Sequence, residues 1–108
     1  MSQSRIEVFE QMLVGDPANT MVMFGLAKEY EKAGDETKLI ETLERYLAAA
    51  DDEGNAYGML ARAYERTKET EKARTAYQRG IEVAKAHGHP SMAEEYRDIL
   101  ESEYEGTA

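Results

Sequence analysis

Residues 26–30 read LAKEY and residues 60–64 read LARAY, so one pattern returns 34 residues further along the chain. At the same spacing Leu43 recurs as Tyr77, and Leu47 recurs as Ile81. A fixed period of this length is typical of a solenoid, in which one helix pair cannot bury its own apolar face and stacks on the next copy. The repeat therefore predicts a scaffold for contacts rather than a catalytic pocket.

Apolar side chains at helical spacing predict an all-α fold of six antiparallel helices. Glycine and proline end helices, and short segments that contain them separate several of the predicted helices. These segments read GDP at 15–17, GD at 34–35 and HGHP at 87–90. The predicted helices span residues 4–14, 20–33, 36–49, 55–67, 70–87 and 91–104.

Short polar side chains stand where these helices begin and can accept hydrogen bonds from the free amides of a first turn. Asn19 or Thr20 is expected to cap the second helix, Asp35 the third and Asn55 the fourth. Residues 105–108 are expected to fray.

The chain has 108 residues, a net charge of −9 and no cysteine. Its length predicts a single domain over residues 1–108, and the lack of cysteine excludes disulfides and thiolate chemistry. The negative charge argues against nucleic acid as a partner, because phosphates need a basic surface. The start of the chain is polar, and the longest apolar run, residues 21–27, is too short to span a bilayer. We therefore expect a cytoplasmic protein without membrane contact.

The repeating positions resemble the motif of the tetratricopeptide repeat (TPR) family, W-x2-L-G-x2-Y followed by A-x3-F-x2-A and proline. The resemblance implies a right-handed helical solenoid: a half repeat at about 4–19, repeats at about 20–53 and 54–87, and a capping helix at about 90–104. It also implies a role in protein–protein interaction. The matching positions are Met23, Leu26, Ala27, Tyr30, Leu39, Leu43 and Tyr46 in the first copy, and Tyr57, Leu60, Ala61, Tyr64, Ala73, Tyr77 and Gly80 in the second.

The sequence departs from the family pattern at several positions. No tryptophan leads either copy, and Leu39 and Tyr46 are larger than usual, so they are expected to push the paired helices apart or re-tilt them. One subfamily clamps a C-terminal carboxylate with lysine and asparagine on its groove helices. Here Phe24, Lys28 and Met59 stand at those positions, so this activity is not expected.

Members of the family typically bind peptide segments in a concave groove lined by the first helix of each pair, which here means residues 20–33 and 55–67. The basic residues of these helices recur in register, Lys28 with Arg62 and Lys32 with Arg66. Cations beside apolar side chains suggest an acidic peptide with one apolar anchor as the ligand. The expected lining is Met21, Phe24, Lys28, Lys32 (or Glu31), Asn55, Met59, Arg62 and Arg66.

The same cations have a purely structural interpretation. Basic side chains late in a helix suit its dipole, and Glu29, Glu31 or Glu65 can neutralise them.

A second candidate surface lies at the N-terminal edge. Because the half repeat lacks its first helix, residues 4–14 are expected to have an uncovered flank, and residues 21–24 are apolar throughout. The alternative function is therefore a self-associating module, a homodimer through the N-terminal helices with no separate peptide ligand.

No constellation of residues predicts an enzyme. His87 and His89 lie in a Gly-Pro turn with too few ligands for a metal, so we interpret them as a solvated turn. The serines belong to no nucleophile motif, and the chain contains no glycine-rich phosphate loop. We expect no catalytic residue, no metal and no cofactor.

Overall fold

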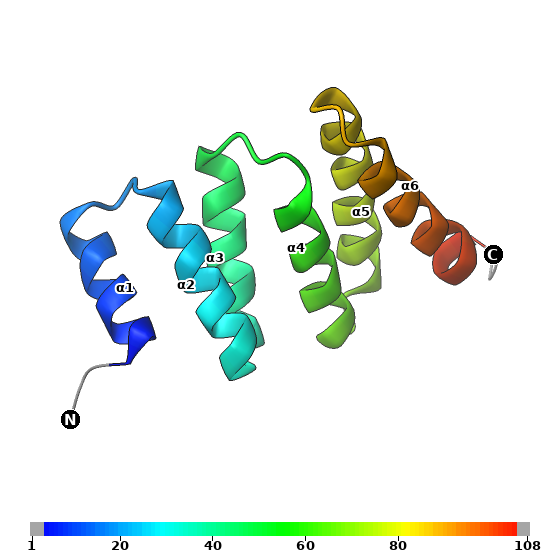
Figure 1. The fold of residues 1–108 in the computed structure, drawn as a ribbon. Coiled ribbons are helices and arrows are strands. Elements are labelled where there is room, and N and C mark those ends of the chain that lie inside the picture. Colours follow the sequence, from blue (N-terminus) through cyan, green and yellow to red (C-terminus); the bar gives the residue numbers. More distant parts are fainter. Residues whose placement is uncertain (1–3, 106–108) are drawn as a thin grey trace. The chain divides into compact units, whose positions relative to one another are not determined.

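The computed structural model describes residues 4–105, which form six α-helices followed by a short π-helix (Figure 1). No strand occurs among these residues, and the predicted all-α fold is confirmed. None of the helices in the described range is both long and apolar enough to cross a membrane. The prediction that residues 105–108 fray falls mostly outside the described residues, because residues 106–108 lie beyond them. The elements are α1 (Arg5–Gly15), α2 (Thr20–Ala33), α3 (Glu36–Ala49), α4 (Asn55–Arg66), α5 (Thr70–Ala86), α6 (Pro90–Ile99) and η1 (Leu100–Glu105).

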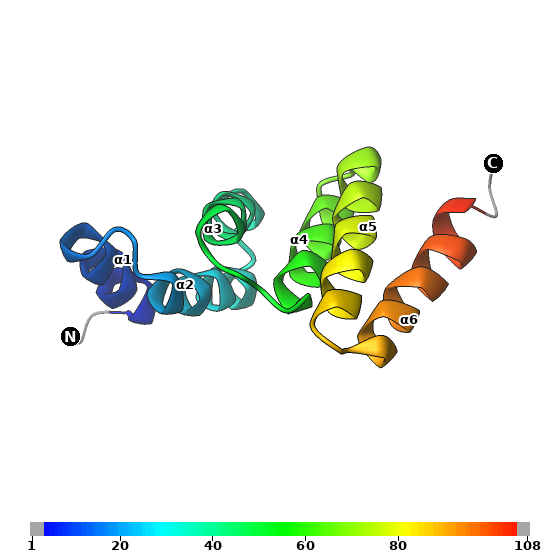
Figure 2. The same cartoon turned by 90° about the horizontal axis from the view of Figure 1, so that it is seen from above.

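The helices divide into two compact units, residues 1–51 and residues 52–108. In the first unit, α2 packs against both α1 and α3 (Figures 1 and 2). Many of the side chains that helical spacing places on the inner faces are buried there, whereas those of Ile6, Phe9, Ile40 and Leu47 are half-buried. Helical spacing also places Met12 on the inner face of α1 with Phe9 and Leu13, but Met12 remains 46% exposed. The buried core of this unit consists of Leu13, Val22, Met23, Leu26, Ala27, Tyr30, Leu39 and Leu43.

The second unit consists of the antiparallel pair α4 and α5, with α6 packed against α5. Its core alternates tyrosine rings with alanines, whose small side chains let the helix backbones approach closely. The largest fully buried side chain is that of Tyr77. The buried core includes Ala56, Leu60, Ala61, Ala63, Tyr64, Ala73, Tyr77, Ala84, Ala93, Tyr96 and Leu100.

Two of the predicted helix caps are confirmed and one is wrong. The Asn19 side chain accepts a hydrogen bond from the Val22 amide, and the Asp35 side chain accepts one from the Lys38 amide. Asn55, by contrast, is the first residue of α4 and does not cap it. The cap position is occupied by Gly54, which carries no side chain to accept the bond.

The last predicted helix, residues 91–104, does not remain α-helical to its end. From Leu100 the chain continues as the π-helix η1. Tyr96, Leu100 and Tyr104 follow one another at intervals of four residues, and all three are buried. In an α-helix each interval of four residues rotates the side chain by about 40° around the helix axis, so the three would drift away from a common face. A wider i→i+5 turn rotates less per residue, which offsets that drift. Tyr104 thereby reaches the side chain of Glu65, to which its hydroxyl donates a hydrogen bond of 2.7 Å.

Candidate functional site

The face of α2 predicted to line a groove is largely accessible. Met21 is 84% exposed, Lys28 and Lys32 are exposed, and Phe24 is half-buried. These residues are three or four positions apart, so they lie along one stripe of the helix. The structure therefore brings together the predicted site residues of the first copy. We call this surface the α2 stripe.

A shallow pocket of about 260 Å³ opens where α2 begins. It is lined by Thr20, Met21, Phe24 and Tyr46. The centroids of the Phe24 and Tyr46 rings lie 5.1 Å apart, a separation at which tilted aromatic rings attract each other. Tyr46, which stands at a motif position and is larger than usual there, thus forms one wall of an apolar recess beside the predicted cations.

The two lysines of the α2 stripe have different neighbours. Lys28 Nζ lies 5.2 Å from the centroid of the Phe24 ring, which is a cation–π contact. Lys32 Nζ lies 3.5 Å from a carboxylate oxygen of Glu29, which also pairs with Arg5 at 3.3 Å. Of the two lysines, Lys32 is therefore the one whose charge is neutralised by a neighbouring glutamate, as the structural interpretation of these cations expected. The contact of Lys28 is with an aromatic ring at the edge of the pocket.

In the second unit, the predicted site residues of α4 differ in accessibility. Asn55, Arg62 and Arg66 are exposed, whereas Met59 is buried and offers little surface to a ligand. The charge of Arg62 also acts on a neighbouring phenol. Burial raises the pKa of the Tyr96 hydroxyl, and the nearby Arg62 charge opposes that rise in part.

Glu65 lies between the two arginines in sequence and was considered as their neutralising partner. Its carboxylate accepts hydrogen bonds from the hydroxyls of Tyr77, at 3.2 Å, and Tyr104, at 2.7 Å. Burial is the main cause that raises the pKa of both phenols, and their contact with the Glu65 charge raises it further. Glu65 therefore ties η1 and α5 to α4.

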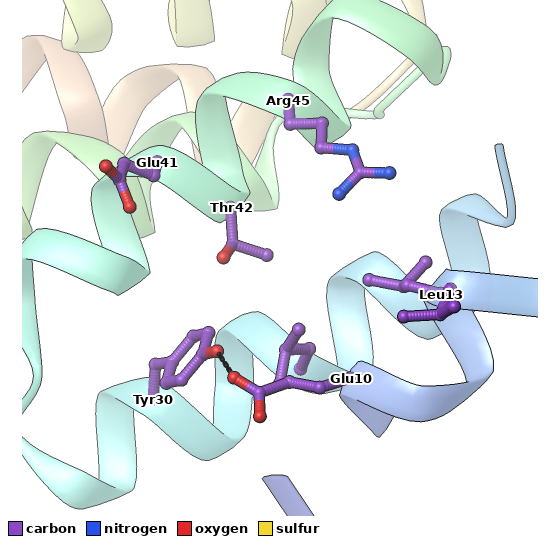
Figure 3. Close-up of a pocket in the computed structure, with 8 residues that line it drawn as sticks. Glu10, Leu13, Tyr30, Glu41, Thr42 and Arg45 are labelled. Carbon is purple, nitrogen blue, oxygen red and sulfur yellow. Dashed lines mark hydrogen bonds between the residues drawn. The ribbon is translucent and has the colours of Figure 1, made fainter. Parts of the chain in front are cut away.

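A pocket that the sequence did not predict lies among the three helices of the first unit (Figure 3). Its volume is about 330 Å³. The Tyr30 ring forms part of the lining, and the Tyr30 hydroxyl donates a hydrogen bond to Glu10. The hydroxyl of a buried tyrosine usually finds a hydrogen-bond partner. The predicted burial of Tyr30 was therefore a signal in the sequence that an acceptor lies near its hydroxyl. The lining residues are Glu10, Leu13, Val14, Leu26, Tyr30, Glu41, Thr42 and Arg45.

The rim of this pocket carries charges of both signs. In Figure 3, Glu41 lies on the left of the view, above Tyr30, and Arg45 lies further to the right, above Leu13. The Arg45 guanidinium donates a hydrogen bond of 2.6 Å to the carbonyl oxygen of Pro17. The lining of the pocket therefore offers both acidic and basic groups.

The N-terminal edge exposes apolar side chains, as the missing first helix of the half repeat predicted. Val8 is 39% exposed, Met12 46%, Val14 83% and Met21 84%. All four belong to α1 or α2. Large exposed apolar side chains on neighbouring helices are a feature of contact surfaces.

The turn that contains the two histidines is tied to the loop before α4. His89 Nε2 lies 2.5 Å from a carboxylate oxygen of Glu53. The ring of His89 therefore has a protein partner, while its side chain remains 40% exposed in the turn. Within residues 4–105, no three side chains of the ligating types gather where they could hold a metal ion.

Comparison with known proteins agrees with the repeat architecture. A sequence model of the tetratricopeptide repeat matches residues 54–87, the predicted second copy. The chain is also 30% identical, over 95 residues, to a TPR repeat-containing protein of Pseudomonas aeruginosa. The alignment covers 88% of this chain and 90% of that protein. Together with the 34-residue period and the paired helices, this similarity establishes that the chain belongs to the tetratricopeptide repeat family.

Proposed function

We propose that this chain is a protein-interaction module that binds an acidic peptide segment with one apolar anchor. Tetratricopeptide repeats generally mediate protein–protein contacts and are typically non-catalytic. The observation that carries the finer proposal is the apolar recess on the α2 stripe, with the Lys28 ammonium at its edge.

In this proposal the apolar anchor of the ligand enters the recess between Met21, Phe24 and Tyr46. A carboxylate of the ligand pairs with Lys28, which exchanges a weak cation–π contact for a charge-assisted hydrogen bond. Methionine at the mouth of the recess adapts to anchors of different shape. On α4 of the second unit, the exposed Asn55, Arg62 and Arg66 offer a separate set of groups suited to acidic or polar ligand atoms.

The net charge of −9 makes a nucleic-acid ligand unfavourable for the module as a whole. A chain without cysteine fits a reducing compartment, and the proposal assigns the protein to the cytoplasm.

The proposal predicts which peptides the protein selects. Panning a random peptide library against the wild-type protein should enrich peptides with aspartate or glutamate near one large apolar residue. Lys28→Glu replaces the attractive charge by a repulsive one, so the selected peptides should bind it about tenfold or more weakly. Affinities of the selected peptides for each variant can be measured by fluorescence anisotropy.

Lys85→Glu is the matched control, because Lys85 is an exposed lysine on α5 and the charge change is identical. It should leave the affinity nearly unchanged. Enrichment of basic or uncharged peptides, or equal weakening by both substitutions, would contradict the proposal.

The exposed side chains of α1 and α2 favour a second candidate function, self-association. In this case the protein is a homodimer held by its N-terminal helices. The observation behind it is that Val8, Met12 and Val14 of α1 and Met21 of α2 remain exposed. The two functions are compatible if the dimer contact leaves the α2 stripe open.

A further inference from the structure

One stripe of α1 has the spacing of a helix–helix contact. It consists of Arg5, Val8, Met12 and Gly15, which are separated by three, four and three residues. That alternation is the spacing of a coiled-coil seam, and it lines side chains up along one side of a helix. Its two large apolar members, Val8 and Met12, are 39% and 46% exposed. We call these four residues the α1 stripe.

The opposite side of α1 is already occupied. Leu13 is buried, and the Phe9 ring lies 3.4 Å from the position that a Cβ would take on Gly25 of α2. The substantial contacts of α1 within the described residues are with α2. Val8 and Met12 are therefore largely left out of the packing of the first unit, whereas Arg5 pairs with Glu29 of α2.

The α1 stripe also carries no acidic side chain, although the protein has a net charge of −9. In a helical projection its nearest neighbours on the outer side are Ser4 and Gln11. Its single charge, on Arg5, lies 3.3 Å from a Glu29 oxygen. Two copies can therefore bring these surfaces together without facing carboxylates.

An apolar partner surface is present on a second copy of the same unit. All large apolar side chains that are exposed among residues 4–105 belong to the first unit. Beyond its first two residues, the exposed side chains of α6 are acidic, at Glu94, Glu95 and Asp98. A contact of the α1 stripe with α6 of another copy would place apolar side chains against these carboxylates, whereas a two-fold contact pairs like with like.

We propose that two copies of this chain form a two-fold symmetric dimer in which their α1 stripes pack antiparallel. The inference rests on the self-association candidate and specifies its surface and register. Val8 lies opposite Met12 of the partner subunit, and Arg5 lies opposite Gly15 of the partner subunit. The antiparallel direction brings Arg5 to the carbonyl end of the partner's α1, which carries partial negative charge. A parallel pairing would instead place Arg5 beside Arg5 of the partner subunit.

The register can be tested by cysteine cross-linking, because the chain has no cysteine of its own. Val8→Cys and Met12→Cys are made separately, with one protein carrying a tag that changes its mass. When the two are mixed and oxidised, the disulfide between positions 8 and 12 should form several-fold faster than either homodimeric disulfide. Only that pair comes within disulfide reach across the two-fold axis, since a bond requires Cβ atoms about 4 Å apart.

Val14→Cys is the matched control, because Val14 is 83% exposed on the same helix but lies off the α1 stripe. It should cross-link slowly, both alone and with either of the other variants. Circular dichroism verifies that each variant is folded, as expected for substitutions of partly exposed side chains.

Sedimentation of the wild-type protein at a series of concentrations separates the possible failures. A monomer at every concentration would overturn both self-association and the α1 register. A dimer whose cysteines prefer 8–8, 12–12 or 14–14 bonds would retain self-association and overturn the antiparallel α1 register. A dimer that favours the 8–12 bond and is weakened about tenfold by Met12→Asp, but not by Val14→Asp, supports the proposal.

Discussion

At the scale of single residues, Tyr96 organises the second unit. Its hydroxyl donates a buried hydrogen bond of 2.9 Å to the carbonyl oxygen of Gly54. A Cβ on Gly58 would lie 2.4 Å from the Tyr96 oxygen, and one on Gly80 would lie 2.9 Å from the ring. The ring therefore occupies a slot that exists because α4 and α5 each present a glycine there. This close approach explains why a small residue is needed at position 80.

Gly80→Ala should destabilise the protein by about 1–3 kcal/mol, the usual cost of overfilling a packed site. Alanine also favours a helix over glycine by about 1 kcal/mol, which acts in the opposite direction. This gain is smaller than most values in the expected range of destabilisation. Urea unfolding followed by circular dichroism measures the difference. Gln78→Ala is the control, since Gln78 is exposed on the same helix. A Gly80→Ala protein as stable as wild type would show that the slot has room to spare.

At the scale of the helix, α4 begins with an arrangement that local sequence rules did not identify. Gly54 has φ +128°, a conformation that other residues rarely adopt. The Asp52 carboxylate accepts hydrogen bonds from the amides of Gly54, at 2.8 Å, and Ala56, at 3.0 Å. Asp52 thus performs the capping that was expected of Asn55. An acid at this end of a helix also interacts favourably with the helix dipole.

Asp52→Ala should therefore cost about 1 kcal/mol, the typical value of an N-terminal cap, while Asn55→Ala should change stability little. Thermal or urea unfolding of the two variants makes the comparison. An equal loss for both, or a larger loss for Asn55→Ala, would restore the original assignment of the cap.

At the scale of the whole molecule, both units depend on buried phenols. Burial raises the pKa of Tyr30 in the first unit and of Tyr77, Tyr96 and Tyr104 in the second. Hydrogen bonds to Glu10 and Glu65 raise the pKa of Tyr30, Tyr77 and Tyr104 further. Each of these contacts favours the neutral phenol over the phenolate. Folding is therefore linked to the protonation of the phenols.

The linkage predicts a loss of stability in alkali. Below the ordinary tyrosine pKa of about 10, the phenols are neutral in both states and contribute no pH dependence. Above it, the unfolded chain releases protons that the folded chain retains, so the free energy of unfolding falls as the pH rises.

Urea unfolding above pH 10 should accordingly give lower midpoints as the pH increases. The phenolate absorbance of the folded protein should rise at higher pH than that of the urea-unfolded chain. Coincident titration of the folded and unfolded protein would contradict the raised pKa values.

The sequence alone determined the helices, their antiparallel order and the membership of the family. These follow from the 34-residue period and from glycine and proline breakers, which act on the backbone within a few residues. It also identified the α2 stripe and the exposed N-terminal edge, since both depend on helical spacing. Only the tertiary structure decided the slot around Tyr96, the π-helical end, the burial of Met59 and the pocket beside Tyr30. Each of these depends on how side chains from different helices fill space together. Tyr96 and Gly54, for example, are 42 residues apart in sequence, a separation at which a periodic pattern carries no information about contact.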